Sequence, residues 1–175
     1  MIVAELFIKE HALFRALLDR VELGLARRDD RARADVGNAL RVLLPSLDRH
    51  AEIEDIVFRY PPDNVDDAPR ALAEVGAQHR ALAALRNEIL FALERSTEYP
   101  FVKLRALTEL LINDLRQHFE TEERRLWPLY PGALKRPVDA VVPIHLDRRA
   151  QALDKELSQA IAAISHSAAR DSEKS

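Results

Sequence analysis

Residues 101–127, FVKLRALTELLINDLRQHFETEERRLW, carry the pattern that decides the fold. Leucines recur along this stretch at helical steps, at Leu104, Leu107, Leu111, Leu115 and Leu126. Side chains three or four residues apart lie on one face of an α-helix, so these leucines form an apolar stripe. Pro128 follows, and proline interrupts helices. The stretch therefore predicts a long amphipathic helix over about 100–127.

The rest of the chain predicts helices of the same kind. Glycine occurs only 4 times, whereas the strong helix formers Ala, Leu, Arg and Glu are abundant. No alternating run of β-branched and aromatic residues indicates a strand. Most of the 9 prolines group between the apolar stripes and divide the chain. The further helices are predicted over about 3–27, 31–59, 66–95 and 143–167.

Long helices with short connections predict an all-α fold, an antiparallel up-down-up-down four-helix bundle with an additional C-terminal helix. We expect the bundle over residues 1–132, the additional helix packed on it over 133–168, and a frayed tail over 169–175. Asp66 and Asp67 are expected at the positive end of the third helix. Pro45 falls inside the second helix and predicts a kink there.

The composition excludes several classes of protein. The 175 residues, 47% hydrophobic and 31% charged, suit one ordinary globular domain. A net charge of −3 provides no basic surface for nucleic acid, and the lack of cysteine excludes disulfides, thiolate zinc sites and a thiol nucleophile. Charged residues interrupt the N-terminal stretch MIVAELFIKEHALF, which argues against a signal peptide. No apolar run is long enough to span a membrane, so a cytoplasmic location is expected.

The histidines reveal an internal repeat. The separation along the chain between His11 and His79 equals the separation between His50 and His118. Glu54 and Glu122 keep the same offset, as do Asp55 and Glu123. The first two helices therefore look like one copy of a unit, and the third and fourth like a second copy.

The repeated positions predict a buried polar cluster. Residues four apart on a helix lie about 6 Å apart along the axis and differ by about 40° in direction. His50 and Glu54 therefore point the same way, as do His118 and Glu122, and His11 and His79 also lie on or beside apolar stripes. An unpaired buried carboxylate costs several kcal/mol or becomes protonated. A metal would satisfy all six groups, since neutral imidazole and carboxylate ligate iron, manganese and zinc.

Two readings of these residues compete. A single histidine in such a place is more often a hydrogen-bonded core residue, and the acids could pair with arginines at helical spacing. Two histidine–glutamate pairs with two further histidines in register favour a shared metal site. One tetrahedral zinc ion would leave two of the ligands idle. Two metals bridged by Glu54 and Glu122, each with two histidines, use all six and keep a position for a bridging oxygen or small ligand.

The sequence resembles the hemerythrin family, specifically its bacterial HHE cation-binding branch. The match is the order His11, His50-x-x-x-Glu54, His79, His118-x-x-x-Glu122, together with the helix endings EDIVFRYP and EERRLWP. It covers about residues 5–130. The resemblance implies an antiparallel four-helix bundle around two non-haem iron ions with an oxo or hydroxo bridge, which react with O2 or related small molecules. Manganese or another divalent metal is the alternative cofactor.

The chain departs from oxygen-carrying hemerythrins in two places. Those proteins have a second histidine one turn along the third helix, where this chain has Ala83. They also take their last carboxylate five residues after the final histidine, which is Glu123 here, whereas the HHE pattern takes Glu122. Water or an outside residue could fill the vacant position. His145 is the only spare histidine that we consider for it, and His166 is expected to be solvated.

Three functions remain open from the sequence. The leading hypothesis is a di-iron protein that binds or senses O2 or reactive oxygen and nitrogen species, with O2, NO or peroxide as its ligand. A histidine-rich ligand set favours Fe(II), and an apolar shell would exclude water; we expect that shell at Phe7, Phe14, Phe58 and Trp127. The second hypothesis is a di-iron enzyme that consumes peroxide or NO, with Tyr60 or Glu123 near the site. The third is a metal-independent helical interaction module.

Overall fold

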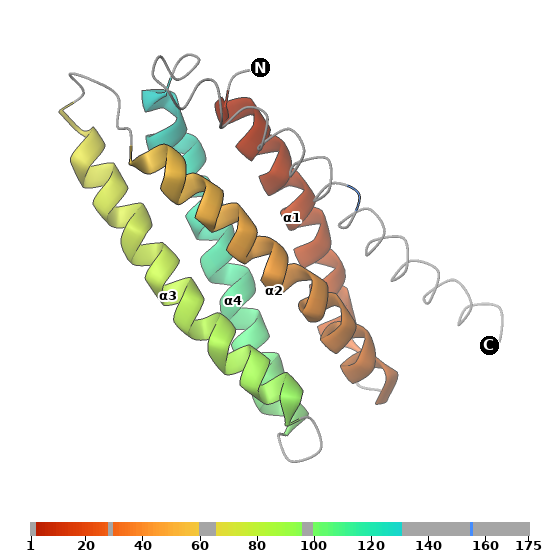
Figure 1. Cartoon of the computed structure of the whole chain (residues 1–175). Helices are drawn as coiled ribbons and strands as arrows, with labels where there is room; N and C mark the ends of the chain where they lie inside the picture. Colours follow the sequence, from red (N-terminus) through yellow and green to blue (C-terminus); the bar gives the residue numbers. More distant parts are fainter. Residues whose placement is uncertain (1–2, 28–29, 60–65, 96–99, 131–154, 156–175) are drawn as a thin grey trace.

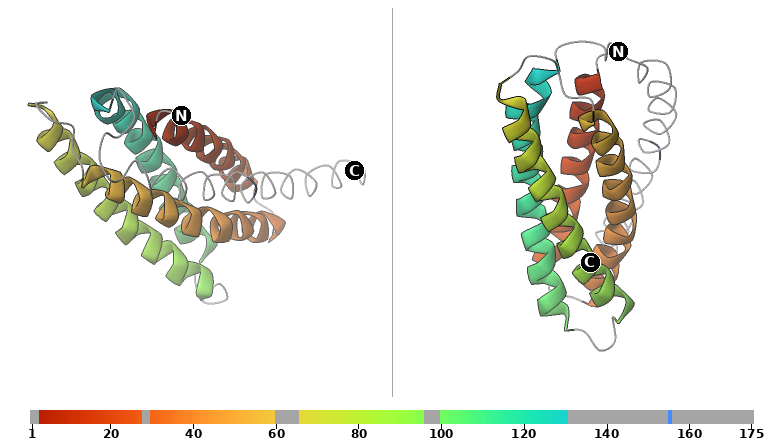
Figure 2. Two further views of the ribbon diagram at one scale, coloured as in Figure 1. Left: turned by 45° about the horizontal axis from the view of Figure 1, so that its top comes forward. Right: turned by 60° about the vertical axis from the view of Figure 1, so that its left-hand side comes forward.

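The computed structural model of the chain describes residues 3–27, 30–59, 66–95, 100–130 and 155. Within them the main elements are four long helices: α1 (Val3–Ala26), α2 (Asp30–Phe58), α3 (Ala68–Glu94) and α4 (Phe101–Thr121). The helices lie side by side as a helical bundle (Figures 1 and 2). The prediction of an all-α fold is confirmed for this part of the chain, which contains no strand.

The end of the fourth helix differs from the prediction of one continuous helix to residue 127. The α-helical geometry of α4 ends at Thr121 and is followed by a π-helix, η1 (Glu122–Leu126), and a 3-10 turn, η2 (Trp127–Leu129). The 3-10 turn accommodates Pro128 in its first residues, where no backbone N–H is needed. The wider π-helical turn lets Glu122, Leu126 and Trp127 all be buried.

Pro45 lies inside α2, and Asp66 and Asp67 lie at the start of α3, as the sequence predicts. Helix α2 continues through Pro45, where the Ser46 hydroxyl donates to the Val42 carbonyl oxygen at 2.9 Å. The kink at Pro45 stays a prediction. Asp67 occupies the position before α3 but makes no side-chain capping hydrogen bond, and Asp66 lies in the preceding turn.

Several predictions fall on residues outside the described part of the chain. These are the additional helix, apart from Lys155, the tail over 169–175, and the surroundings of Tyr60, His145 and His166. Among the described helices, none is both long enough and apolar enough to cross a membrane.

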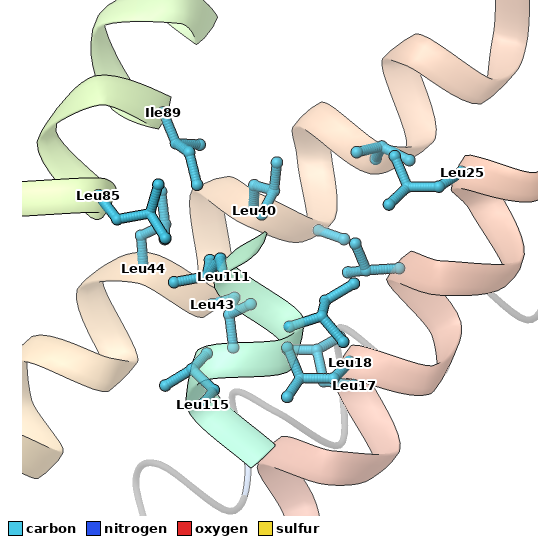
Figure 3. Packing of buried hydrophobic residues seen from close by; sticks show 14 of the residues in the cluster. Leu17, Leu18, Leu25, Leu40, Leu43, Leu44, Leu85, Ile89, Leu111 and Leu115 are labelled. Atoms are coloured by element: carbon cyan, nitrogen blue, oxygen red, sulfur yellow. The ribbon is translucent and has the colours of Figure 1, made fainter. Parts of the chain in front are cut away.

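Two hydrophobic clusters hold the helices together. The larger cluster is dominated by leucines from all four helices, which interdigitate in Figure 3, among them Leu17, Leu18, Leu40, Leu43, Leu85, Leu111 and Leu115. The smaller cluster contains Phe7, Ile53, Val57, Val75, Leu126 and Trp127. Along each of the four chain segments, one end contributes to the larger cluster and the other end to the smaller cluster. The residues of the repeated histidine–glutamate pattern lie in between.

The larger cluster should carry most of the stability of the fold. Leu18 is fully buried, whereas Leu23 on the same helix is 62% exposed. We expect Leu18→Ala to lower the free energy of unfolding by about 2–5 kcal/mol, because it leaves a cavity in a packed core. Leu23→Ala should change it by no more than about 0.5 kcal/mol. Urea denaturation of both variants tests this, and equal effects would contradict the described packing.

Candidate metal centre

The four helices bring all six predicted residues to one place. His11 comes from α1, His50 and Glu54 from α2, His79 from α3, His118 from α4, and Glu122 from the start of η1. Both glutamate side chains are completely buried, and of the four histidines in the cluster only His79 exceeds a few per cent exposure, at 11%. The structure therefore confirms the prediction that these six side chains point into the bundle.

One half of the cluster is formed by His11 and His50. Their Nε2 atoms lie 3.1 Å apart and face the same carboxylates. Glu54 Oε1 lies 3.1 Å from His50 Nε2 and 3.7 Å from His11 Nε2. Glu122 Oε2 lies 3.2 Å from His11 Nε2. Four potential ligand atoms thus converge from three segments of the chain.

The other half is formed by His79 and His118. Glu54 turns its second oxygen, Oε2, to His79 Nε2 at 3.3 Å. Glu122 likewise turns its other oxygen, Oε1, to His118 Nε2 at 3.5 Å and to His79 Nε2 at 3.7 Å. Each carboxylate therefore offers one oxygen to each pair of histidines, which is the arrangement of a carboxylate that bridges two ions.

The positions of these nitrogen and oxygen atoms suit metal coordination better than hydrogen bonding among themselves. In each half, one atom from each of four residues lies within 4.8 Å of the other three. All four carboxylate oxygens of Glu54 and Glu122, and Nε2 of His79, are buried without a hydrogen-bond partner. Buried polar atoms are normally paired, and an unpaired carboxylate is among the costliest groups to bury. Cations between the two halves would remove this cost.

Each histidine is also held from its outer side. In the first half, His11 Nδ1 lies 3.0 Å from Glu123 Oε1, and His50 Nδ1 lies 2.7 Å from Glu10 Oε2. In the second half, His79 Nδ1 lies 3.3 Å from Asp55 Oδ1, and His118 Nδ1 lies 3.0 Å from Gln78 Oε1. An acceptor at Nδ1 fixes the ring orientation and leaves Nε2 free to bind a metal. All four rings therefore present Nε2 to the centre.

The residues that contact the histidine Nδ1 atoms also recur with the offset of the internal repeat. Glu10 and Gln78, which hold His50 and His118, are separated by the same offset as the histidines themselves. Asp55 and Glu123 share this offset as well, and each holds the histidine of the other unit. Sequence reasoning missed the roles of Glu10 and Gln78. Their position directly before a repeated histidine was the signal that could have found them.

The structure also distinguishes the positions of Glu122 and Glu123 relative to the cluster. Glu122 has both oxygens inside the cluster, whereas the Glu123 side chain is 25% exposed and lies outside it. Arg15 donates to both oxygens of Glu123, at 2.7 and 3.1 Å, and thereby orients the carboxylate that holds His11. The geometry thus favours the HHE pattern, with Glu122 rather than Glu123 as the candidate ligand.

Protonation differs between the histidines of the cluster. Burial lowers the pKa of His118 to about 4, so this imidazole is neutral at pH 7. Burial opposes charge on His50 and His79 too, but carboxylates outweigh it and raise both pKa values to about 10. Those carboxylates are Glu54 with Glu10 for His50, and Glu122 with Glu54 for His79. Without metal, protonated histidines neutralise the buried carboxylates.

Aromatic rings surround the cluster. Phe7 and Phe14 meet the His50 ring edge to face, at 5.5 and 5.1 Å between centroids, and Phe58 lies 6.2 Å from the His79 ring. Trp127 reaches the site through Phe7, on which it stacks at 4.5 Å. Phe119, which stacks on His11 at 4.3 Å, was not among the predicted shell residues. These rings make the described surroundings of the site largely apolar.

Comparison of the chain with protein-family models, with curated proteins and with solved structures found no match in any of the three.

Loss of one of the two central carboxylates should weaken metal binding at the candidate centre. We expect Glu122→Gln to weaken metal binding by more than the roughly 10- to 100-fold that loss of an outer partner costs, because the amide removes a charged donor shared by both halves. Glu120→Gln, whose side chain lies 54% exposed on α4, is the matched control and should bind like the wild type. Metal analysis after dialysis measures both. Equal metal content in the two variants would contradict the assignment.

Metal affinity should depend steeply on pH. A protonated imidazole cannot bind a metal, and the raised pKa values of His50 and His79 mean that protons compete until the pH approaches about 10. Affinity should therefore rise with pH and fall as the pH drops toward about 5, with protons released on binding at pH 7. Calorimetric titration with Mn²⁺ in buffers of different ionisation enthalpy measures this release. Heats that do not depend on the buffer would refute it.

Proposed function

We propose that this chain is a hemerythrin-like di-iron protein of the HHE type that binds or senses O2 or reactive oxygen and nitrogen species. The observation that carries the proposal is the buried set of four histidine Nε2 atoms around two carboxylates without hydrogen-bond partners. Two buried glutamates that face only imidazole groups are costly to keep in a core, since apolar residues of similar volume are often as stable or more stable there.

The proposal includes the antiparallel up-down-up-down arrangement. Helices α1 and α3 pass from the smaller hydrophobic cluster to the larger one as the chain advances, from Phe7 to Phe14 and from Val75 to Leu85. Helices α2 and α4 pass in the opposite order. This alternation of direction supports the bundle topology that the resemblance implies, with the centre between the two clusters.

Two ions account for the donors better than one. Six donors with two carboxylates that each face both halves suit a bridged pair, whereas a single tetrahedral ion would use four. Imidazole and carboxylate donors without thiolate suit iron, and manganese is the alternative. A bound iron pair would supply reversible redox chemistry and a place for O2, NO or peroxide to bind.

The residues of the chain would determine what reaches such a pair. Phe7, Phe14, Phe58 and Phe119 keep the surroundings apolar and exclude bulk water. Glu10, Asp55, Gln78 and Glu123 hold the imidazole rings in place. A cavity of about 50 Å³ adjoins the centre, large enough for a few small molecules.

Metal analysis of protein produced with iron tests the proposal. We expect about two iron ions per chain, ferric absorption in the near ultraviolet after exposure to air, and a change in that absorption when NO or peroxide is added to the protein. Glu122→Gln should lose all three properties. Catalase and NO-reductase assays on the same sample separate binding from turnover. Protein that contains no iron and takes none up from Fe(II) solution would disprove the proposal.

A further inference from the structure

The cavity beside the centre is lined by three of its four histidines. Its wall includes the rings of His50, His79 and His118, with the apolar side chains of Leu47, Leu82, Leu111, Leu115 and Phe119 around them. Ala51, Ala83 and Arg86 complete it. The open space therefore adjoins both histidines of one half, His79 and His118, but only His50 of the other half, because His11 does not line it.

The internal repeat explains why the space is open on this side. When the two units are aligned by the offset of their histidines, Leu82 takes the place of Phe14, Ala83 that of Arg15, and Ala51 that of Phe119. Around His11, Phe119 stacks on the ring, and Arg15 supports its carboxylate partner. Smaller side chains occupy all three equivalent positions around His79, and the cavity is the volume that they leave.

Arg86 gives this cavity a positive group. Its Nη1 pairs with Asp48, and its Nη2 donates to Asn87 Oδ1 at 3.1 Å. Its third nitrogen, Nε, is buried, and its N–H has no acceptor. A helical side chain points back toward the N-terminus of its helix, which carries the guanidinium from position 86 toward the turn of Ala83 and His79.

We propose that the cavity beside His79 and His118 is a binding site for a small oxyanion, whose oxygen accepts a hydrogen bond from Arg86 Nε–H. This inference rests on the proposed function, because the ions held by the histidines supply the second positive charge. A negatively charged ligand is stable in such apolar surroundings only between cations and donors. The cavity volume of about 50 Å³ suits an anion of a few atoms, such as nitrite or formate.

Calorimetric titration of the metal-loaded protein with sodium nitrite tests the site. Arg86→Gln should weaken nitrite binding by about 10- to 100-fold, since it removes a charge-assisted hydrogen bond. Arg80→Gln removes the same charge from the exposed face of α3 and should leave the affinity unchanged. Ala83→Leu should fill the cavity and abolish nitrite binding.

Asp48→Asn should tighten nitrite binding, because it frees the Arg86 guanidinium from its carboxylate partner. A gain in affinity cannot come from misfolding of the variant.

Metal analysis of every sample distinguishes the two proposals. Full metal content with weaker nitrite binding in Arg86→Gln, and unchanged binding in Arg80→Gln, supports the anion site. Full metal content with equal nitrite affinity in the wild type and in Arg86→Gln overturns the anion site and leaves the di-iron proposal standing. Wild-type protein without metal overturns both. Nitrite binding that Asp48→Asn weakens would also count against the role of Arg86.

Discussion

The burial of two carboxylates in the middle of the bundle is the constraint on which the rest of the structure depends. Glu54 and Glu122 are fully enclosed, and none of their oxygens has a hydrogen-bond partner. Their charge must be balanced by protonated histidines or by cations, and each of the four helices contributes one imidazole to this polar layer. The two hydrophobic clusters lie on either side of this polar layer, and their packing stabilises the fold enough to tolerate it.

The fold and the members of the centre could be predicted because both depend on spacing within helices. The leucine steps that end at Leu126 indicated the fourth helix, and the four-residue step from His118 to Glu122 placed both side chains on one face. The shared offset of the histidines then indicated that the two units meet. The wide turn at Glu122–Leu126 could not be predicted, because a π-helix reflects the burial of Leu126 and Trp127 against other segments and not a local pattern.

Other parts of the centre depend on contacts between helices, which spacing does not specify. The partner of His11 at Nδ1 is Glu123, 112 residues away, and that of His50 is Glu10, 40 residues away. The cavity arises from what is missing at Ala51 and Ala83 and from the direction of one arginine, so its shape requires coordinates. The sequence shows that residue 83 is alanine. It does not show whether neighbouring side chains fill the space beside this residue.

The constant offset of the repeat extends from the histidines to the residues that hold them, and the carboxylates Asp55 and Glu123 each cross to the opposite unit. Such a pattern is what duplication and fusion of an ancestral helical hairpin would leave, if that hairpin once assembled with an identical copy of itself. In that symmetric ancestor any substitution would have altered both ends of the centre at once. Joining two such copies in one chain would let equivalent positions such as Arg15 and Ala83 differ, so that the two ends of the centre could have different surroundings.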